Sequence, residues 1–173
     1  GLVRNLTAGE ILGEVLAANV RHGGTLKKRA ITNVVLMGSG EPLDNYDNVT
    51  KFLWLLSAEK GLNMSLRNVS LSTCGLCEKI IELADSGLTV TLTISLHSPY
   101  DKRRSEIMPI NNKYNVASVI EAAKYYLKKT GRRVIFEYSL IEGENCSVRD
   151  AEKLAELLRS MQCHVNLIRL NPV

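Results

Sequence analysis

Apolar residues recur along the chain in two alternating patterns, one typical of helices and one typical of buried strands. Helical spacing places Ile11, Val15 and Leu16 on one face, and Thr7 with Glu10 forms a capping box just before them. Four further segments show helical spacing, within residues 49–56, 76–84, 116–127 and 151–161. The expected N-terminal capping residues are Asp47 for the first of these, Asn115 for the third, and Ser147 with Asp150 for the fourth. Gly61, Gly87 and Gly131 are expected to end the first, second and third of these helices. The pattern predicts five helices.

Short apolar runs stand between these helices and predict five strands. They cover residues 31–37, 69–71, 88–94, 134–140 and 165–170. The run Val34-Val35-Leu36-Met37 is continuous rather than alternating, which is typical of a strand buried on both faces of a parallel sheet. The segment that contains Pro99 and Pro109 is expected to be a long loop. Helices that alternate with strands imply parallel strands with right-handed crossovers. We expect an α/β fold, a partial (β/α) barrel, with a doubly wound sheet as the alternative.

Length and composition are those of one ordinary globular domain. The chain has 173 residues, of which 45% are apolar and 23% are charged. No run approaches the roughly 18 consecutive apolar residues that a membrane span needs, and the first residues lack the apolar segment of a signal peptide. We therefore expect a cytoplasmic protein without a membrane partner. The pattern begins on a helix and stops after a strand, so residues 1–173 are expected to be one core domain truncated at both ends.

Charge and cysteine content add little to this picture. The net charge of +4 is compatible with an RNA partner but is common in proteins that never bind RNA. Of the four cysteines, only Cys74-x-x-Cys77 has the spacing of metal ligands. A lone pair of this kind is a weak signal, because zinc and iron–sulfur sites need more ligands. We expect structural thiols, with Cys74 at a strand end and Cys77 opening a helix.

Polar or small residues follow most of the predicted strands. They are Gly38-Ser39-Gly40-Glu41-Pro42, Ser72-Thr73-Cys74-Gly75, Ser95-Leu96-His97-Ser98-Pro99, Glu137 with Tyr138, and Asn171-Pro172. The carboxyl ends of parallel strands in a barrel meet at one rim, where active sites of such barrels lie. We therefore expect Glu41, Ser72, Ser95 and Asn171 to gather around one nucleoside-sized ligand.

Each of these residues has a functional and a structural interpretation. Glu41 could receive a ligand ammonium by charge-assisted hydrogen bonds, or it could be a solvated turn residue. Ser72 and Ser95 could bond ligand hydroxyl or carboxylate groups, or cap strand ends. His97 could contact a ligand or act as an acid or base, and Asn171 could bind an adenine edge or start a turn. The loop residues Lys102, Arg103 and Arg104 could contact RNA phosphates, although a solvated loop is the simpler interpretation.

These strand ends, in this order, resemble the radical S-adenosylmethionine (radical-SAM) RNA methyltransferases of the RlmN/Cfr type. The matching segments are Arg4-Asn5-Leu6, Asn33 to Gly38 running into Gly40-Glu41-Pro42, Leu71-Ser72-Thr73, Ile94 to His97, Met108 to Asn111 with Lys113-Tyr114-Asn115, and Val165 to Ile168 ending at Asn171-Pro172. They span nearly the whole chain. The resemblance implies a partial (β/α) barrel of the radical-SAM type.

The resemblance also implies which residues hold the cofactor. Gly40 and Glu41 would hold the methionyl amino end of S-adenosylmethionine, and Ser72 would be a further contact. Ser95, Leu96 and His97 match the segment that lines the ribose side, and Asn171 matches a contact after the final strand. No catalytic residue and no metal ligand is expected within this chain.

The family reaction is methylation of carbon 2 of an adenine in 23S ribosomal RNA and often in transfer RNA. It uses a 4Fe–4S cluster, an electron donor such as flavodoxin or ferredoxin, and two molecules of S-adenosylmethionine. The three-cysteine loop that binds the cluster and the methyl-carrying cysteine have no counterpart here, so the chain alone is expected to be inactive. A radical-SAM enzyme with a different substrate and a non-catalytic S-adenosylmethionine-binding module remain as alternatives.

Overall fold

A single parallel sheet organises the molecule, whose computed structural model describes residues 3–169. Five strands follow one another in the order in which they occur along the chain, and every neighbouring pair is parallel. The strands are β1 (Val34–Leu36), β2 (Val69–Thr73), β3 (Thr91–Ser95), β4 (Val134–Leu140) and β5 (Cys163–Arg169). The register pairs Leu36 with Leu71, Ser72 with Thr93, and Ser95 with Glu137.

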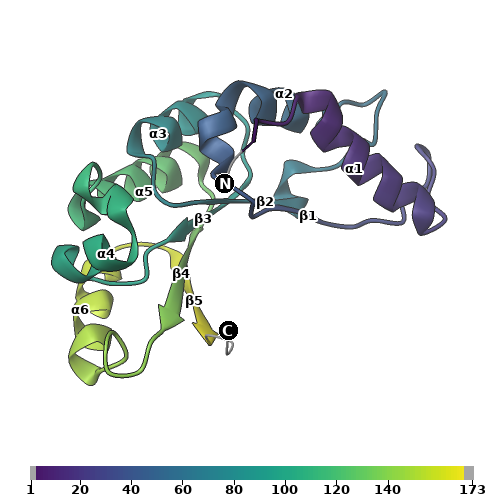
Figure 1. Ribbon diagram of the computed structural model, residues 1–173. Helices are drawn as coiled ribbons and strands as arrows, with labels where there is room; N and C mark the ends of the chain where they lie inside the picture. The colour runs from purple at the N-terminus through teal and green to yellow at the C-terminus, as the bar shows by residue number, and fades with distance from the viewer. Residues whose placement is uncertain (1–2, 170–173) are drawn as a thin grey trace.

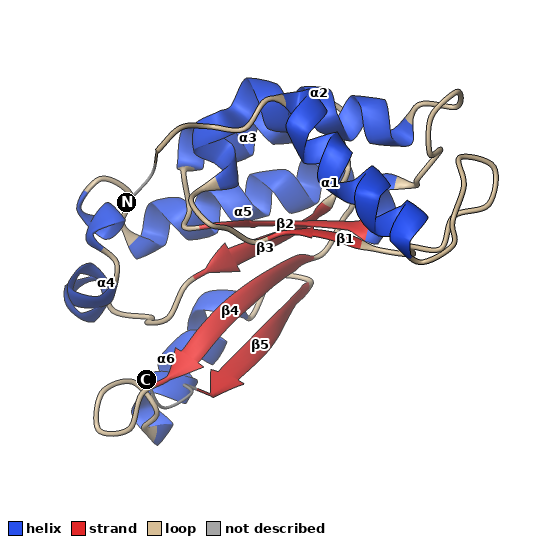
Figure 2. Cartoon of the chain, turned by 45° about the vertical axis from the view of Figure 1, so that its right-hand side comes forward, coloured by secondary structure: helices blue, strands red, loops and turns tan. Residues whose placement is uncertain are grey.

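Six α-helices occur within residues 3–169. They are α1 (Ala8–Arg21), α2 (Tyr46–Ser57), α3 (Cys77–Asp85), α4 (Asp101–Ile107), α5 (Val116–Thr130) and α6 (Val148–Leu158). Short 3₁₀ turns cover Pro42–Asn45, Leu66–Asn68 and Pro109–Asn112. Figures 1 and 2 show that the helices lie along one side of the curved sheet and leave the other side without a helix. This arrangement is a section of a (β/α) barrel and confirms the predicted fold class. A doubly wound sheet would carry helices on both faces and would reverse its strand order.

The apolar core lies between the sheet and this helical layer. Alternate strand residues supply it, and they include Leu71, Leu92, Ile94 and Phe136, all of which are fully buried. The helices add their own apolar stripes, such as Ile80 and Leu83 on α3 and Val119 and Ala123 on α5. We call this side of the sheet the covered face.

The opposite side of the sheet, which we call the open face, carries the alternate strand residues. They are Val35 on β1, Ser70 and Ser72 on β2, Thr91, Thr93 and Ser95 on β3, Ile135, Glu137 and Ser139 on β4, and His164, Asn166 and Ile168 on β5. Side chains alternate between the two faces of a strand, so these residues point away from the core. Nine of the twelve are polar, which is unusual for the interior of a sheet and typical of a surface that receives a polar ligand.

Several helix boundaries follow the predicted caps. Thr7 forms the expected capping box with Glu10 at the start of α1, and Ser147 forms one with Asp150 at the start of α6. The side chain of Asn115 caps α5 by accepting from the Ser118 N–H. Gly131 ends α5 in the left-handed conformation, with φ of 66°, which glycine adopts without steric cost.

The second helix starts and ends differently from the prediction. It begins at Tyr46, and the N-cap position belongs to Asn45 rather than Asp47 because a 3₁₀ turn, Pro42–Asn45, leads directly into it. It ends at Ser57, so Gly61 lies in the following turn and not at the end of the helix. The Gly61 N–H donates to Ala58 O across this turn.

Two further expectations were wrong. The first strand is shorter than predicted, and Val35 and Met37 are 58% and 59% exposed rather than buried on both faces. Val35 belongs to the open face, and β1 is an edge of the sheet within the described residues. The segment predicted as a long loop contains α4 and a 3₁₀ turn. The prolines at 99 and 109 flank α4 without interrupting it, because proline breaks a helix from its interior and both lie outside the helix.

Candidate functional site: the rim and the open face

The turn after β1 brings the Glu41 carboxylate to the end of β2. Glu41 Oε1 accepts a hydrogen bond from the Leu43 N–H at 3.0 Å and so caps the 3₁₀ turn. Its Oε2 accepts from the Cys74 N–H at 2.7 Å, across 33 residues of sequence. Glu41 therefore joins the carboxyl ends of two neighbouring strands. A carboxylate offers about four acceptor positions, so these two bonds leave capacity for an ammonium group.

A hollow lies beside this turn. It has a volume of about 200 Å³, and its lining includes Gly38, Gly40, Glu41 and the N-terminal residues Arg4 and Asn5. This volume is below the roughly 300–1,000 Å³ of a pocket for a whole drug-sized ligand. The hollow suits one end of a ligand whose remainder extends elsewhere along the rim.

The two predicted serines lie close together on the open face. Ser72 pairs with Thr93 across β2 and β3, and Ser95 is two positions beyond Thr93 on the same face. Their side chains therefore project from neighbouring strands into the same space. Ser72 is 8% exposed and Ser95 is half-buried. The structure thus places Glu41, Ser72 and Ser95 at the carboxyl ends of β1, β2 and β3, as predicted. Asn171 lies outside the described residues.

Leu96 and His97 contribute to the rim in different ways. The Leu96 side chain is fully buried in the core, so only its backbone can face a ligand. His97 has a positive φ of 58° and its Nδ1 accepts a hydrogen bond from the Ser139 N–H at 3.0 Å. An accepting Nδ1 defines the neutral imidazole with its proton on Nε2. Burial, together with the charge of Arg104, lowers the pKa of His97 below its ordinary value and favours this form.

The buried side chain of Arg104 connects the strand ends that form the rim. Its guanidinium donates to the carbonyl oxygens of Cys74 (2.8 Å), Ser95 (3.2 Å) and Leu96 (3.2 Å), and so connects the ends of β2 and β3. It also donates to Asn111 Oδ1 at 2.8 Å and to Tyr114 O at 3.1 Å. The side chain is fully buried, and no carboxylate within the described residues forms an ion pair with it. This positive charge beneath the strand tips favours an anionic group above them.

The structural role of Arg104 contradicts the interpretation of Lys102, Arg103 and Arg104 as a solvated loop. Lys102 is exposed and Arg103 is half-buried, whereas Arg104 is buried on the inner side of α4. Tyr100, Arg104 and Ile107 are spaced by four and three residues, as on one helical face. That spacing could have revealed the helix, but an arginine at its centre hid the pattern from a search for apolar residues.

The turn after β2 depends on Gly75 and carries the paired cysteines. Gly75 has φ of 103°, and a Cβ there would lie 3.0 Å from Val119 Cγ2 and 3.4 Å from Arg104 Nη2. Cys74 follows β2 and Cys77 opens α3, as predicted. Burial raises the pKa of the Cys74 thiol to about 12 and also raises that of Cys77. Both are therefore protonated near neutral pH, the form that binds metals poorly.

Among residues 3–169, no three histidine, cysteine or acidic side chains come together as a metal site. The residues described here therefore do not fit an iron–sulfur cluster as its ligands. They do fit a polar organic ligand, since the open face is polar and the rim offers a carboxylate, hydroxyls and backbone groups. No helix within the same residues is long and apolar enough to cross a membrane.

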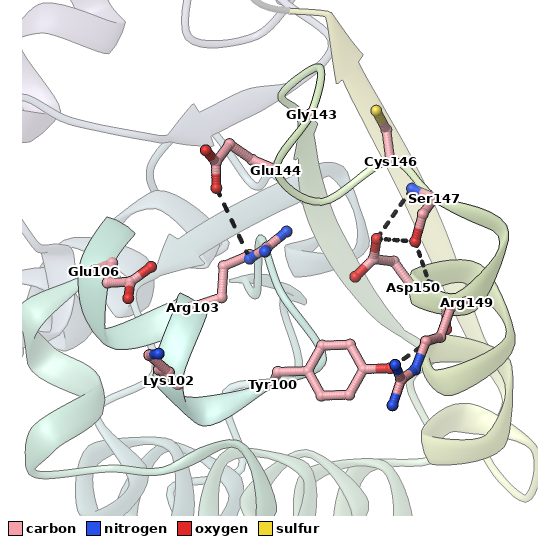
Figure 3. A pocket seen from close by; sticks show the side chains of 10 residues that line it. All are labelled: Tyr100, Lys102, Arg103, Glu106, Gly143, Glu144, Cys146, Ser147, Arg149 and Asp150. Atoms are coloured by element: carbon pink, nitrogen blue, oxygen red, sulfur yellow. Dashed lines mark hydrogen bonds and ion pairs between the residues drawn. The ribbon is translucent and has the colours of Figure 1, made fainter.

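A second hollow, of about 700 Å³, lies between α4 and the loop that joins β4 to α6 (Figure 3). Its charged lining residues are Lys102, Arg103, Arg149, Glu106, Glu144 and Asp150. Arg103 Nε lies 3.9 Å from Glu144 Oε2, and Asp150 is engaged by the Ser147 cap. Three positive and three negative groups balance each other, so this hollow is not a simple anion site.

The fold and the rim define a class of protein: a partial (β/α) barrel whose strand ends and open face can hold a polar cofactor. Residues 4–159 match the model of the radical SAM superfamily. The chain belongs to this superfamily.

Several relatives are similar to this chain over its whole length. The chain is 56% identical over 173 residues to a Clostridium perfringens protein named "Probable dual-specificity RNA methyltransferase RlmN", and 52% identical to a Clostridium botulinum protein of the same name. All of the chain aligns, but it covers only 48% and 49% of those proteins. A crystal structure of a radical SAM methyltransferase from Sphaerobacter thermophilus superposes with a TM-score of 0.93 at 46% identity, over 99% of this chain and 50% of that one. The chain therefore spans about half the length of these relatives.

Proposed function

We propose that this chain is the S-adenosylmethionine-binding core of an RNA methyltransferase that methylates carbon 2 of adenine in 23S ribosomal RNA and in transfer RNA. The names of the relatives support an RNA methyltransferase. One structural observation carries the cofactor part: the Glu41 carboxylate bridges the ends of β1 and β2, the strand end at which Ser72 faces the open side of the sheet.

The residues of this chain would bind and orient the cofactor. Glu41 would receive its ammonium group, and Gly40 would let that group approach the backbone closely. Ser72, Ser95 and Asn171 would bond its polar groups along the rim. The backbone of Leu96 would line the ribose side by contact alone, because its N–H donates to Glu137 O and its O accepts from Ser98 N–H and Arg104 Nε. His97 would present its Nε2–H as a donor, because its Nδ1 is already occupied by the Ser139 N–H.

The remaining chemistry belongs to groups outside the described residues. When bound, S-adenosylmethionine supplies the methyl carbon and, together with a 4Fe–4S cluster, a radical that can activate an unreactive carbon. We propose that the cluster ligands, the methyl-carrying cysteine and the RNA-binding domain belong to other parts of a longer protein. A cytoplasmic flavodoxin or ferredoxin would supply the electrons. Residues 1–173 alone would then be inactive.

The reaction is tested by analysing RNA from cells that depend on the full protein. The full-length gene is expressed in a strain that lacks its own adenine methyltransferase, and nucleosides from 23S and transfer RNA are separated by mass spectrometry. We expect 2-methyladenosine in both RNAs. Only 8-methyladenosine, or no methylated adenine beside a correctly folded protein, would contradict the proposed reaction.

The cofactor site is tested separately with Glu41→Gln in the full-length protein. The amide keeps one acceptor but loses the charge that a ligand ammonium would contact. A hydrogen bond to a charged group is worth about 1.5–3 kcal/mol, which corresponds to roughly 10–100-fold in affinity for S-adenosylmethionine by calorimetry. The matched control is Glu152→Gln, an exposed glutamate on α6 that does not line the hollow beside Glu41. Equal affinity of both variants would exclude Glu41 from the site.

A further inference from the structure

Glu137 lies in the middle of β4 on the open face of the sheet. Its neighbours across the ladder are Ser95 on β3 and Asn166 on β5, so it stands in the same row as one residue of the proposed cofactor site. Its backbone oxygen accepts from the Leu96 and His97 N–H groups at 3.0 and 3.3 Å. The backbone of this residue therefore fixes the turn after β3, and its side chain projects toward the space above Ser95.

Glu137 is a largely buried residue whose carboxyl group opens onto the space above the sheet and has no partner among residues 3–169. The residue is 7% exposed, yet its side chain makes no hydrogen bond and no ion pair with any other residue between 3 and 169. The nearest groups on the open face are neutral, since Ser95, Asn166, Thr93 and Ser139 carry no charge. A buried charge that lacks a partner is destabilising, and desolvation accordingly raises the pKa of Glu137.

An apolar residue at this position would serve the fold better than an unpaired acid. Ile135 and Ile168, on the same face, show that this surface accepts apolar side chains. The acid at this position therefore does not contribute to the stability of the described residues. Groups that weaken the fold in this way are typical of functional sites.

We propose that Glu137 is a positioning residue for a bound adenosine, and that its carboxyl group accepts a hydrogen bond from an amino or hydroxyl group of that nucleoside. This inference rests on the proposed function, in which two adenosines enter the barrel: the one within S-adenosylmethionine and the target nucleotide of the RNA. Both offer the same donors. The proximity of Ser95 favours the adenosine of the cofactor.

The experiment uses the full-length protein with its cluster and the substitution Glu137→Gln. Calorimetry measures the affinity for S-adenosylmethionine, 5′-deoxyadenosine and methionine, and a separate titration measures the affinity for an RNA hairpin substrate. The amide keeps an acceptor but loses the charge, so a charge-assisted hydrogen bond becomes a weaker neutral one, which predicts roughly tenfold weakening for the two adenosine compounds. Methionine affinity should not change, because methionine carries no nucleoside.

Two controls separate positioning from a structural role. Glu152→Gln removes an exposed carboxylate from α6 and should change no affinity. Infrared difference spectra of the wild-type protein, recorded on addition of S-adenosylmethionine, should show a shifted carboxyl band that Glu137→Gln lacks. The shift in the wild-type protein detects a ligand contact at a carboxyl group, and its absence from Glu137→Gln assigns that contact to Glu137.

Each outcome either supports or overturns the role proposed for Glu137. Weaker RNA binding with unchanged S-adenosylmethionine binding would support it and assign the adenosine to the substrate. Unchanged affinities for all adenosine compounds, a parallel loss of methionine affinity, or failure of Glu137→Gln to fold would overturn it. Wild-type protein that binds no S-adenosylmethionine would instead refute the proposed function itself.

Discussion

The two faces of the sheet are built from neighbouring residues and yet follow opposite rules. On the covered face, Leu92, Ile94 and Phe136 pack against helices and are fully buried. On the open face, Thr93, Ser95 and Glu137 lie one position away and are polar. The covered face therefore stabilises the fold by burying apolar surface, whereas the open face keeps polar groups where a ligand can reach them. Alternate residues of one strand therefore serve two purposes, stability on the covered face and ligand access on the open face.

The largest effect is expected where the two faces meet, at Arg104. Arg104→Ala would leave five acceptor groups without their donor, and each unsatisfied buried group costs roughly 1–3 kcal/mol. That sum approaches the whole stability of an ordinary domain, so the variant should unfold under conditions in which the wild type is folded. Chemical denaturation followed by circular dichroism measures this. Lys102→Ala, a change of an exposed residue on the same helix, should have almost no effect.

Adjacent residues of β3 should differ in how much they stabilise the fold, because they belong to opposite faces of the sheet. Leu92→Ala should destabilise the protein by about 2–5 kcal/mol, because it leaves a cavity under the helices. Thr93→Ala should cost about 1 kcal/mol or less, because no helix packs against the open face. Denaturant midpoints of the two variants provide the measurement. Equal losses would mean that the open face is packed like a core, and the distinction between the faces would fail.

A smaller effect is expected from the protonation of His97. Its pKa in the folded protein is lower than its ordinary value of 6.5, so the unfolded chain takes up a proton first when the pH falls. The stabilisation is complete above pH 6.5 and is lost as the pH falls toward the folded-state pKa. The melting temperature should therefore decrease between pH 7.5 and 5.5. His97→Asn keeps an acceptor and tolerates the positive φ, and its melting temperature should change less over this range.

The smallest effect concerns the stability of Glu137→Gln. The pKa of Glu137 is raised in the folded protein, so the folded state binds its proton more tightly than the unfolded chain does. Wild-type stability should therefore fall as the pH rises from 4.5 through the folded-state pKa. The amide variant lacks this loss and should be at least as stable as the wild type at pH 7.5. A clearly lower melting temperature would show that the carboxylate supports the fold.

Much of the fold could be predicted because its determinants are local. The capping boxes at Thr7 and Ser147 and the αL glycine at Gly131 act within one helical turn. Helices and strands alternate along the chain, and such alternation implies parallel strands with right-handed crossovers. These two facts were sufficient to predict a section of a (β/α) barrel. Boundaries were less accurate around β1 and α2, where a 3₁₀ turn capped by Glu41 precedes the helix and the same carboxylate also bonds to Cys74 in a distant part of the chain.

Some residues of the candidate site could likewise be predicted from local sequence, and others could not. The polar residues at the strand ends were visible as a pattern, and the structure places Glu41, Ser72 and Ser95 at neighbouring strand ends. Whether they hold a cofactor stays a prediction, as does the role of Gly40, Leu96, His97 and Asn171. Arg104 was misinterpreted and the state of Glu137 was not foreseen, because their environment is built by residues far from them in sequence.

The order of the elements, the type of sheet and the residues that end each strand could all be inferred from the amino-acid sequence, since periodicity, caps and alternation depend on nearby residues. Three further properties depend on how the chain packs: which face of each strand is covered, which of three basic residues is buried and which acid lacks a partner. Burial and desolvation depend on everything that surrounds a group in space, and a linear pattern does not contain that information.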